Sequence, residues 1–245
     1  MLEFYFWPTP NTWKVAIMLQ ECGLPYEVIP VNISAGEQFA PEFLAISPNN
    51  RIPALVDPEA EGGPISIFES GAILMYLAEK TGRFMPADLH QRYDVLQWLY
   101  WQVGNLGPMA GQLGHFRNYS EERIEYALQR YGDEYNRLLG VLNRGLEGRD
   151  YLAGDYSIAD MATWPWVRSG EYMDQPLEEF PNVIRWFREV GERPGVKQGF
   201  ALGMDWLGSG PPKAGNEKAN RGNKNLFGHT AKAVAELSKK AADKS

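Results

Sequence analysis

Cysteine is almost missing from this chain of 245 residues, since Cys22 is the only one. One thiol cannot form an intramolecular disulfide, a Cys-rich metal site or the Cys-x-x-Cys motif of dithiol redox proteins. Cys22 is also expected at the C-terminal end of a helix over residues 12–21, where the helix dipole disfavours a thiolate. We therefore expect Cys22 to pack, and disulfide exchange by the protein's own thiols is excluded.

Positive charge and long apolar runs are also scarce. The chain has 24 Lys and Arg against 31 Asp and Glu, a formal net charge of -7, which argues against a nucleic-acid groove. No stretch approaches the ~20 apolar residues of a membrane span, and the start lacks the basic region of a secretion signal. With one cysteine as well, we expect a cytoplasmic protein that binds neither membrane nor nucleic acid. The three histidines lack metal-ligand spacing, so no metal is expected.

The first part of the chain alternates strand and helix patterns. Apolar stretches at 3–7 and 26–31 flank the helix over 12–21, which implies a parallel βαβ unit. A short helix over 41–45, a hairpin formed by 54–57 and 65–68, and a helix over 70–81 follow. This order predicts an α/β thioredoxin-like domain over residues 1–84.

The second part is helical in pattern and ends in a basic tail. Helices are expected over 89–103, with a break near 104–108, and over 121–145, and a capping box at 157–160 (SIAD) opens another. These patterns predict an all-α domain over 89–207. Residues 208–245 carry eight basic and three acidic residues, and we expect a flexible extension there, in which 229–244 could form a weak helix. Docking on the acidic body, binding a partner and covering a substrate pocket are the alternatives.

Two turns of the first domain offer groups for a ligand. The turn before the first helix holds Thr9 and Asn11, whose hydroxyl and amide could stabilise a thiolate. Ile52 and Pro53 precede a strand, and a cis bond between them would leave the Ile52 peptide free to pair with an extended peptide. Taken singly, a helix cap and an ordinary trans-proline turn explain these residues as well.

A third candidate is the start of the helix over 70–81. Its first-turn N–H groups and the positive end of its dipole favour an anion, to which Ser70 could add its hydroxyl. Glu69 could accept hydrogen bonds from an ammonium group. The pair therefore suits an amino-acid head group, although Ser70 could simply cap the helix.

In this order along the chain, the three candidates resemble the glutathione transferase family. The likeness covers about residues 1–207, and several segments are similar to its Nu class. These segments are 8–11 (PTPN), 36–39 (GEQF), 46–53 (ISPNNRIP), 68–74 (FESGAIL), 97–104 (QWLYWQVG) and 107–109 (GPM). The resemblance implies the glutathione transferase fold, a homodimer, and glutathione as cosubstrate, with two molecules or glutathione disulfide bound per subunit.

The resemblance also implies roles for individual residues. Thr9 and Asn11 would hold the glutathione thiolate, and Arg130 would reach across the dimer interface. The remaining glutathione contacts implied are Gln38, Arg51, Ile52, Pro53, Glu69 and Ser70. The residues expected to face a second substrate are Trp7, Trp98, Trp101, Gln102, Asn105 and His115, with core packing as the alternative for Trp98 and Trp101.

The function favoured by the sequence is reduction of disulfide bonds by glutathione. Because Cys22 is expected to pack, the reacting thiols would belong to bound glutathione. One alternative is a glutathione transferase or lyase acting on an electrophilic or thioether substrate. A further alternative is a non-catalytic glutathione-binding protein with a regulatory role.

Overall fold

A mixed sheet of four strands forms the first part of the fold in the computed structural model, which describes residues 1–207, 225–227 and 229–242. The strands are β1 (Leu2–Phe6), β2 (Tyr26–Pro30), β3 (Ala54–Asp57) and β4 (Ile65–Phe68). Their order is β2-β1-β3-β4, with β1 parallel to β2 and antiparallel to β3, and with β3 and β4 antiparallel. The predicted thioredoxin-like arrangement is confirmed.

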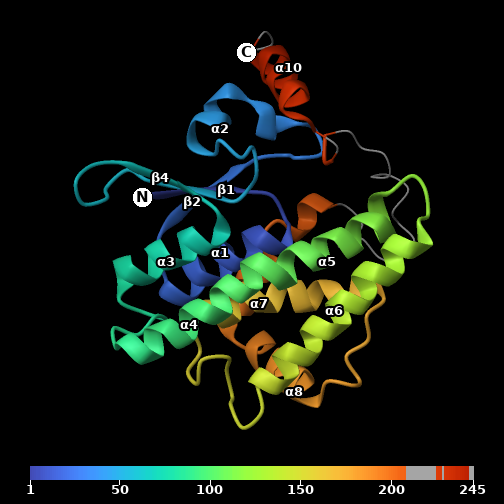
Figure 1. Ribbon diagram of the computed structural model, residues 1–245. Coiled ribbons are helices and arrows are strands. Elements are labelled where there is room, and N and C mark those ends of the chain that lie inside the picture. The colour runs from blue at the N-terminus through green and yellow to red at the C-terminus, as the bar shows by residue number, and fades with distance from the viewer. Residues whose placement is uncertain (208–224, 228, 243–245) are drawn as a thin grey trace.

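Helices cover both faces of this sheet (Figure 1). Figure 1 shows α1 (Pro10–Cys22) and α3 (Ser70–Thr81) on one face and α2 (Pro41–Ile46) on the other. The alternation along β1 explains the two layers. Phe4 and Phe6 are fully buried with α1, whereas Tyr5 points the other way and packs on Phe43 of α2.

The helical part follows, as predicted. Its helices are α4 (Leu89–Trp101), α5 (Gly107–Gly114), α6 (Glu125–Gly145), α7 (Ile158–Arg168), α8 (Pro181–Gly191) and α9 (Pro194–Ala201). The first helix, α1, contacts both α7 and α9, so it is covered by the sheet on one side and by helices on the other. Gly199 allows this close approach, since a Cβ there would lie 2.6 Å from the backbone N of Ile17.

The predicted break near 104–108 is wrong. The backbone stays helical from α4 into α5 through η2 (Gln102–Leu106), a π-helical turn in which the Gly107 N–H donates to the Gln102 carbonyl. Pro108 lies in the first turn of α5. Proline is tolerated in a first turn because the N–H that it lacks is not needed there. The widened turn also leaves room for its ring.

The predicted capping box at the start of α7 is confirmed. Ser157 caps the helix, and Asp160 accepts hydrogen bonds from the backbone N–H groups of Leu152 and Ser157 and from Nε1 of Trp186. Burial raises the pKa of Asp160 to about 6. This carboxyl group therefore ties the loop before α7 to α8.

The described part of the tail includes one helix, which lies within the weak helix expected over 229–244. Helix α10 (Ala231–Ala242) contacts α2 and η1 (Glu37–Phe39), and it lies at the end of the molecule farthest from the helical part (Figure 1). Residues 225–227 also make defined contacts, which are given below. The rest of the predicted flexible stretch, 208–224 and 228, lies outside the described residues.

Among residues 1–207, 225–227 and 229–242, no helix is both long and apolar enough to cross a membrane. Within the same residues, no group of His, Cys, Asp and Glu side chains is arranged to hold a metal ion.

Candidate functional site

The N-terminus of α3 forms one end of the candidate site. Ser70 is its first residue and is 5% exposed, whereas Glu69 just before it faces solvent. Glu69 has a φ of 72°, a left-handed conformation that is rare outside glycine, and Asn49 Nδ2 donates to its Oε1 at 3.1 Å. Such local strain is typical of ligand-binding positions. The geometry brings a carboxylate next to a helix N-terminus, which suits a ligand with both charges.

A buried lysine lies beneath this end. Lys14 of α1 is 2% exposed, and its Nζ donates to Gln102 Oε1 at 2.6 Å and to Ser70 Oγ at 3.4 Å. Within the part of the chain that the structure describes, no carboxylate forms an ion pair with it. Burial lowers the pKa of Lys14 to about 7, and the charge of Glu69 acts in the opposite direction. Because Lys14 donates to Ser70, the Ser70 hydroxyl proton is left to donate to an anion.

The other end of the site is the turn before α1. Thr12 organises it, because its Oγ1 accepts from the Thr9 N–H at 3.1 Å and donates to the Trp7 carbonyl at 2.5 Å. The hydroxyls of Thr9 and Thr12 lie 3.1 Å apart. The Thr9 backbone is thus held at the first turn of α1, with its side chain half-buried at the helix N-terminus.

Asn11 is oriented by a residue of the helical part. Nε1 of Trp166, on α7, donates to Asn11 Oδ1 at 2.9 Å. Since Oδ1 is the acceptor in this bond, the Nδ2 group of Asn11 remains as a donor on the other side of the amide. A donor of this kind at a helix N-terminus is suited to stabilise a thiolate.

Cys22 lies at the opposite end of α1. It lies twelve positions after Pro10, which corresponds to about 18 Å along the helix axis. Its Sγ is 3.7 Å from Thr81 Oγ1, and burial raises the pKa of the thiol. Both facts agree with a packing role and place the protein's only thiol away from Thr9 and Asn11.

The middle of the candidate site carries the contacts expected for a peptide backbone. The Ile52–Pro53 bond is cis. Gln38 Nε2 donates to the Asn225 carbonyl at 2.6 Å, and Arg51 Nη1 donates to the Leu226 carbonyl at 3.3 Å. Two side chains predicted to bind glutathione therefore bind backbone carbonyls of the chain's own C-terminal segment.

The residues expected to face a second substrate are dispersed. The Trp98 ring packs against Trp101 at 5.2 Å between centroids and lies against Gly145 of α6. Gln102 is fully buried, with Lys14 as its partner. Asn105 is exposed on η2.

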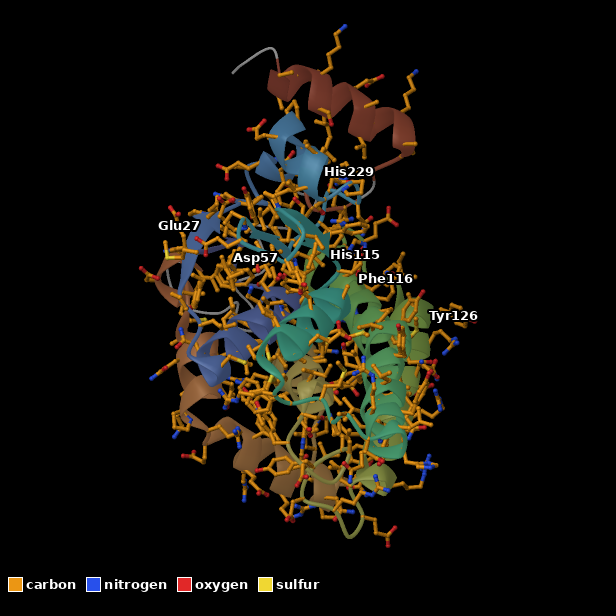
Figure 2. The ribbon with its side chains drawn as sticks, turned by 90° about the vertical axis from the view of Figure 1, so that its left-hand side faces the viewer. Glu27, Asp57, His115, Phe116, Tyr126 and His229 are labelled. Atoms are coloured by element: carbon orange, nitrogen blue, oxygen red, sulfur yellow. The ribbon has the colours of Figure 1, made fainter. Side chains whose placement is uncertain are left out.

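Two other members of that set meet the C-terminal part of the chain. The Trp7 ring packs on Trp206, with 5.6 Å between centroids. His115 follows α5 and faces Phe227, with ring centroids 4.5 Å apart. Figure 2 shows His115 and His229 on the same side of the molecule. Arg130 is exposed on α6, and its Nη1 lies 3.9 Å from Glu134 Oε2.

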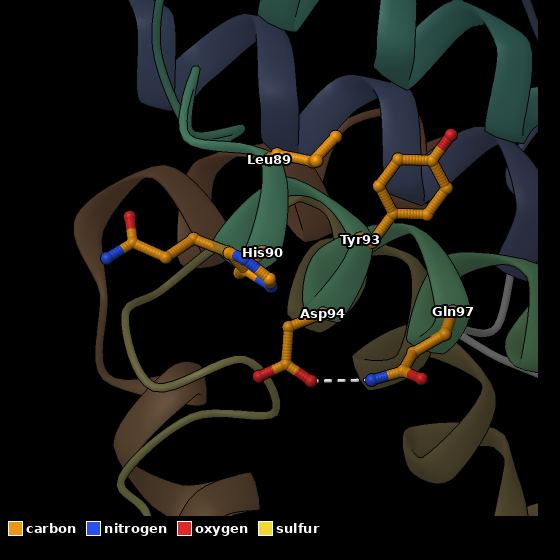
Figure 3. A pocket seen from close by; sticks show the side chains of 6 residues that line it. Leu89, His90, Tyr93, Asp94 and Gln97 are labelled. Atoms are coloured by element: carbon orange, nitrogen blue, oxygen red, sulfur yellow. Dashed lines mark hydrogen bonds between the residues drawn. The ribbon is translucent and has the colours of Figure 1, made fainter.

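A separate hollow of about 760 Å³ lies on α4 (Figure 3). Its lining residues are Leu89, His90, Gln91, Tyr93, Asp94 and Gln97. There, Asp94 Oδ1 accepts a hydrogen bond from Gln97 Nε2 at 2.6 Å. None of the predicted site residues lines this hollow, so it is distinct from the candidate site.

The sequence prediction missed Lys14, Thr12 and Trp166. Lys14 carried a usable signal, because it follows Asn11 by three positions and so shares its face of the helix. Trp166 carried none, since its contact with Asn11 spans 155 positions.

Comparison with known proteins identifies the family. The glutathione S-transferase N-terminal domain matches residues 2–79, and the C-terminal domain of the same family matches residues 107–194. The chain is 49% identical over 201 residues to the disulfide-bond oxidoreductase YfcG of Escherichia coli, which covers 81% of this chain and 94% of that protein. The chain belongs to the glutathione transferase family. A second relative within the family, the disulfide-bond oxidoreductase YghU of Escherichia coli, is 42% identical, covering 81% of this chain and 73% of its own length.

Solved structures of glutathione transferases share the fold. One from Pseudomonas putida, with one glutathione disulfide bound per subunit, has a TM-score of 0.79 and 45% identity, covering 82% of this chain and 91% of that one. One from Burkholderia graminis, with two glutathione molecules bound per subunit, has a TM-score of 0.80 and 46% identity, covering 82% and 88%. The family and fold predicted from the sequence are confirmed.

Proposed function

We propose that this chain is a glutathione-dependent disulfide-bond reductase in which both reacting thiols belong to glutathione. The observation that carries the proposal is the geometry of the turn before α1. We call this turn the sulfur end of the site, because Thr9 and Asn11 would bind the glutathione sulfur there. It offers a hydroxyl and an oriented amide at a helix N-terminus, while the only cysteine of the chain lies at the other end of that helix. The names of the two Escherichia coli relatives and the glutathione species bound in the two solved structures support it.

The N-terminus of α3, with Glu69 and Ser70, would hold the γ-glutamyl group. Its carboxylate would accept from Ser70 and from the first N–H groups of α3, above the charge of Lys14. Its ammonium would meet Glu69, which Asn49 already orients. Gln38, Arg51 and the Ile52 peptide would bind the rest of the peptide, with Pro53 fixing the turn.

The sulfur end would then favour the thiolate form of the bound thiol. Hydrogen bonds from Thr9 and Asn11 and the dipole of α1 all stabilise negative charge there. The thiolate attacks one sulfur of the substrate disulfide, forms a mixed disulfide and releases one substrate thiol. A second glutathione thiolate attacks the glutathione sulfur of that mixed disulfide and releases the other substrate thiol. Two glutathione molecules and one disulfide thus give glutathione disulfide and two thiols, and no protein acid or base is consumed.

The active form would be a homodimer in the cytosol. Large side chains on α4 and α6 are exposed in the single chain, with Tyr93 62%, Tyr100 61% and Tyr126 78% exposed. Arg130 lies on the same helix as Tyr126 and would reach the partner's site from there. A reducing compartment would keep both Cys22 and glutathione as thiols.

Two assays test this proposal. Reduction of bis(2-hydroxyethyl) disulfide by glutathione, followed through glutathione reductase and NADPH, is expected to proceed. Conjugation of glutathione to 1-chloro-2,4-dinitrobenzene is expected to be slow by comparison. Conjugation without disulfide reduction would replace the proposal with a transferase, and glutathione binding without either activity would leave a binding protein.

Substitutions at the sulfur end sharpen the test. Thr9→Ala and Asn11→Ala are expected to lower disulfide turnover by roughly 10- to 100-fold, because each removes a hydrogen bond to the developing charge. Both variants should bind S-methylglutathione nearly as tightly as the wild-type protein. Unchanged turnover in both would show that the sulfur binds elsewhere.

A further inference from the structure

The C-terminal segment, residues 225–227 and 229, contacts two of the side chains proposed to bind glutathione, Gln38 and Arg51. Its contacts with Gln38 and Arg51 are made by backbone carbonyls, at 2.6 Å from Gln38 Nε2 and 3.3 Å from Arg51 Nη1. In return, Asn225 Nδ2 donates to the Ser34 carbonyl at 2.9 Å. Leu226 is only 7% exposed. The segment is therefore seated among these side chains through both its backbone and its side chains.

Aromatic side chains of the segment also pack against residues on both sides of it. The Phe227 ring lies between His115, with 4.5 Å between centroids, and Tyr119, with 5.1 Å. The His229 ring meets Phe39 edge-on at 4.8 Å. Figure 2 shows His229 beside the α2 region and His115 at the neighbouring end of the helical part. The segment thus bridges the sheet domain and the helical part across the site.

Helix α10 holds the segment in place. It follows the segment directly and packs on η1 and α2, the same elements that carry Gln38 and its neighbours. A tethered segment meets its site at a high effective concentration, so weak contacts suffice to occupy it. The matching family domains end at residue 194, so both α10 and the segment lie beyond them.

We propose that the glutathione site has a second, intramolecular ligand, the C-terminal segment (residues 225–227 and 229), which competes with glutathione for Gln38 and Arg51. The proposal rests on the proposed function, since it takes these two side chains as glutathione contacts. Glutathione is itself a short peptide, and its carbonyl and carboxylate oxygens need the same donors that Asn225 and Leu226 occupy. One donor group cannot serve both ligands at full strength.

Competition by the segment would raise the apparent dissociation constant of glutathione by a measurable factor. A site that is free in only a fraction of molecules binds its ligand more weakly by that fraction. If the segment occupies the site in roughly nine molecules out of ten, the apparent dissociation constant of glutathione rises about tenfold. Releasing the segment should restore the tighter constant. A disulfide that needs the space beside His115 should displace Phe227 in the same way.

Full-length variants test the proposal. Leu226→Ser together with Phe227→Ser removes the two apolar side chains by which the segment packs, and it leaves every residue of the proposed glutathione site intact. By isothermal titration calorimetry, this double variant is expected to bind glutathione roughly three- to tenfold more tightly than wild type. The matched control is Lys232→Ser with Glu236→Ser, two exposed positions of α10, and it is expected to bind like wild type.

Hydrogen exchange gives a second readout on the unmodified protein. Saturating glutathione is expected to accelerate amide exchange of residues 225–227, because the segment leaves its seat. Equal dissociation constants in all three proteins, or weaker binding by the double variant, would overturn the competition while leaving the proposed function standing. Absence of glutathione binding by every protein would overturn both.

Discussion

Lys14 Nζ donates a 2.6 Å hydrogen bond to Gln102 Oε1 and so joins α1 to the π-helical turn of the helical part. The bond places an ammonium group under Ser70 with only neutral acceptors around it, among the residues described. A buried cation without an ion-pair partner is costly to the fold. The cost is explained if the anion of a ligand completes the pair.

The first prediction concerns this lysine and binding. Lys14→Met should weaken S-methylglutathione binding at pH 7 by about tenfold, because charge-assisted stabilisation of the ligand carboxylate is lost. The ligand lacks a free thiol, so the effect isolates the γ-glutamyl end. Lys80→Met is the control, since Lys80 pairs with Asp57 instead. Equal weakening by both variants in titration calorimetry would contradict the account.

A second prediction follows from the pKa of Lys14. Folding lowers that pKa from 10.5 to about 7, so between these values the unfolded chain binds more protons than the folded one. Stability should therefore rise with pH across this window. From urea titrations at pH 7 and pH 9, the free energy of unfolding of wild type should gain on the order of 2 kcal/mol over that of Lys14→Met. Parallel pH curves for the two proteins would show that Lys14 does not titrate in this way.

Trp166 provides the third prediction, as a positioning residue. Trp166→Phe keeps an aromatic ring but removes the Nε1–H that fixes the Asn11 amide. We expect kcat/KM for disulfide reduction to fall by about tenfold and its pH profile to move to higher pH, because the thiolate loses an oriented donor. In Trp164→Phe the lost hydrogen bond goes to the Phe187 carbonyl instead, so the profile should stay in place. Identical pH profiles for the two variants would refute this role.

Asp160 provides the fourth prediction, which concerns stability. Asp160→Asn places an NH₂ group where the N–H groups of Leu152 and Ser157 and the Trp186 indole now find acceptors. We expect a loss of about 2–4 kcal/mol in the free energy of unfolding, measured in urea at pH 7. The exposed Asp155→Asn should lose less than about 0.5 kcal/mol. A loss of similar size at both positions would contradict the network's role.

The fifth prediction concerns the proposed dimer. Tyr100→Glu with Tyr126→Glu introduces charge on the exposed faces of α4 and α6. Sedimentation velocity should show a monomer. Titration calorimetry should show weaker glutathione binding, because Arg130 would then lack a partner site. Ala235→Glu on the exposed side of α10 should remain dimeric. A wild-type protein that sediments as a monomer would remove the interface from the account.

Local patterns predicted the fold where the determinants are close in sequence. The strand alternation of β1, the capping box of Ser157 and Asp160 and the segments around Ile52 and Glu69 each depend on a few neighbouring residues. The family resemblance added the order in which these features form one site. The described contacts confirm the capping box and the sheet arrangement, while the ligand roles remain predictions.

Long-range contacts account for what the sequence did not predict. Lys14 meets Gln102 across 88 positions, and Gln38 meets Asn225 across 187. Composition favoured a solvated stretch over 208–228, because glycine, asparagine, lysine and proline are frequent there. Within it, however, Leu226 is buried and Phe227 packs on His115. The predicted break before Pro108 failed for a different reason. A π-helical turn lets proline follow a helix without ending it.

The central claim is that bound glutathione, and not the protein, supplies the reacting thiols. The most direct measurement is disulfide reduction by Cys22→Ala, a chain with no thiol at all, with glutathione at saturation and glutathione disulfide followed as product. The account predicts a kcat within about twofold of wild type, because Cys22 is remote from Thr9 and its raised pKa disfavours the thiolate. Loss of turnover in a variant that still binds glutathione and keeps its thermal stability would contradict it.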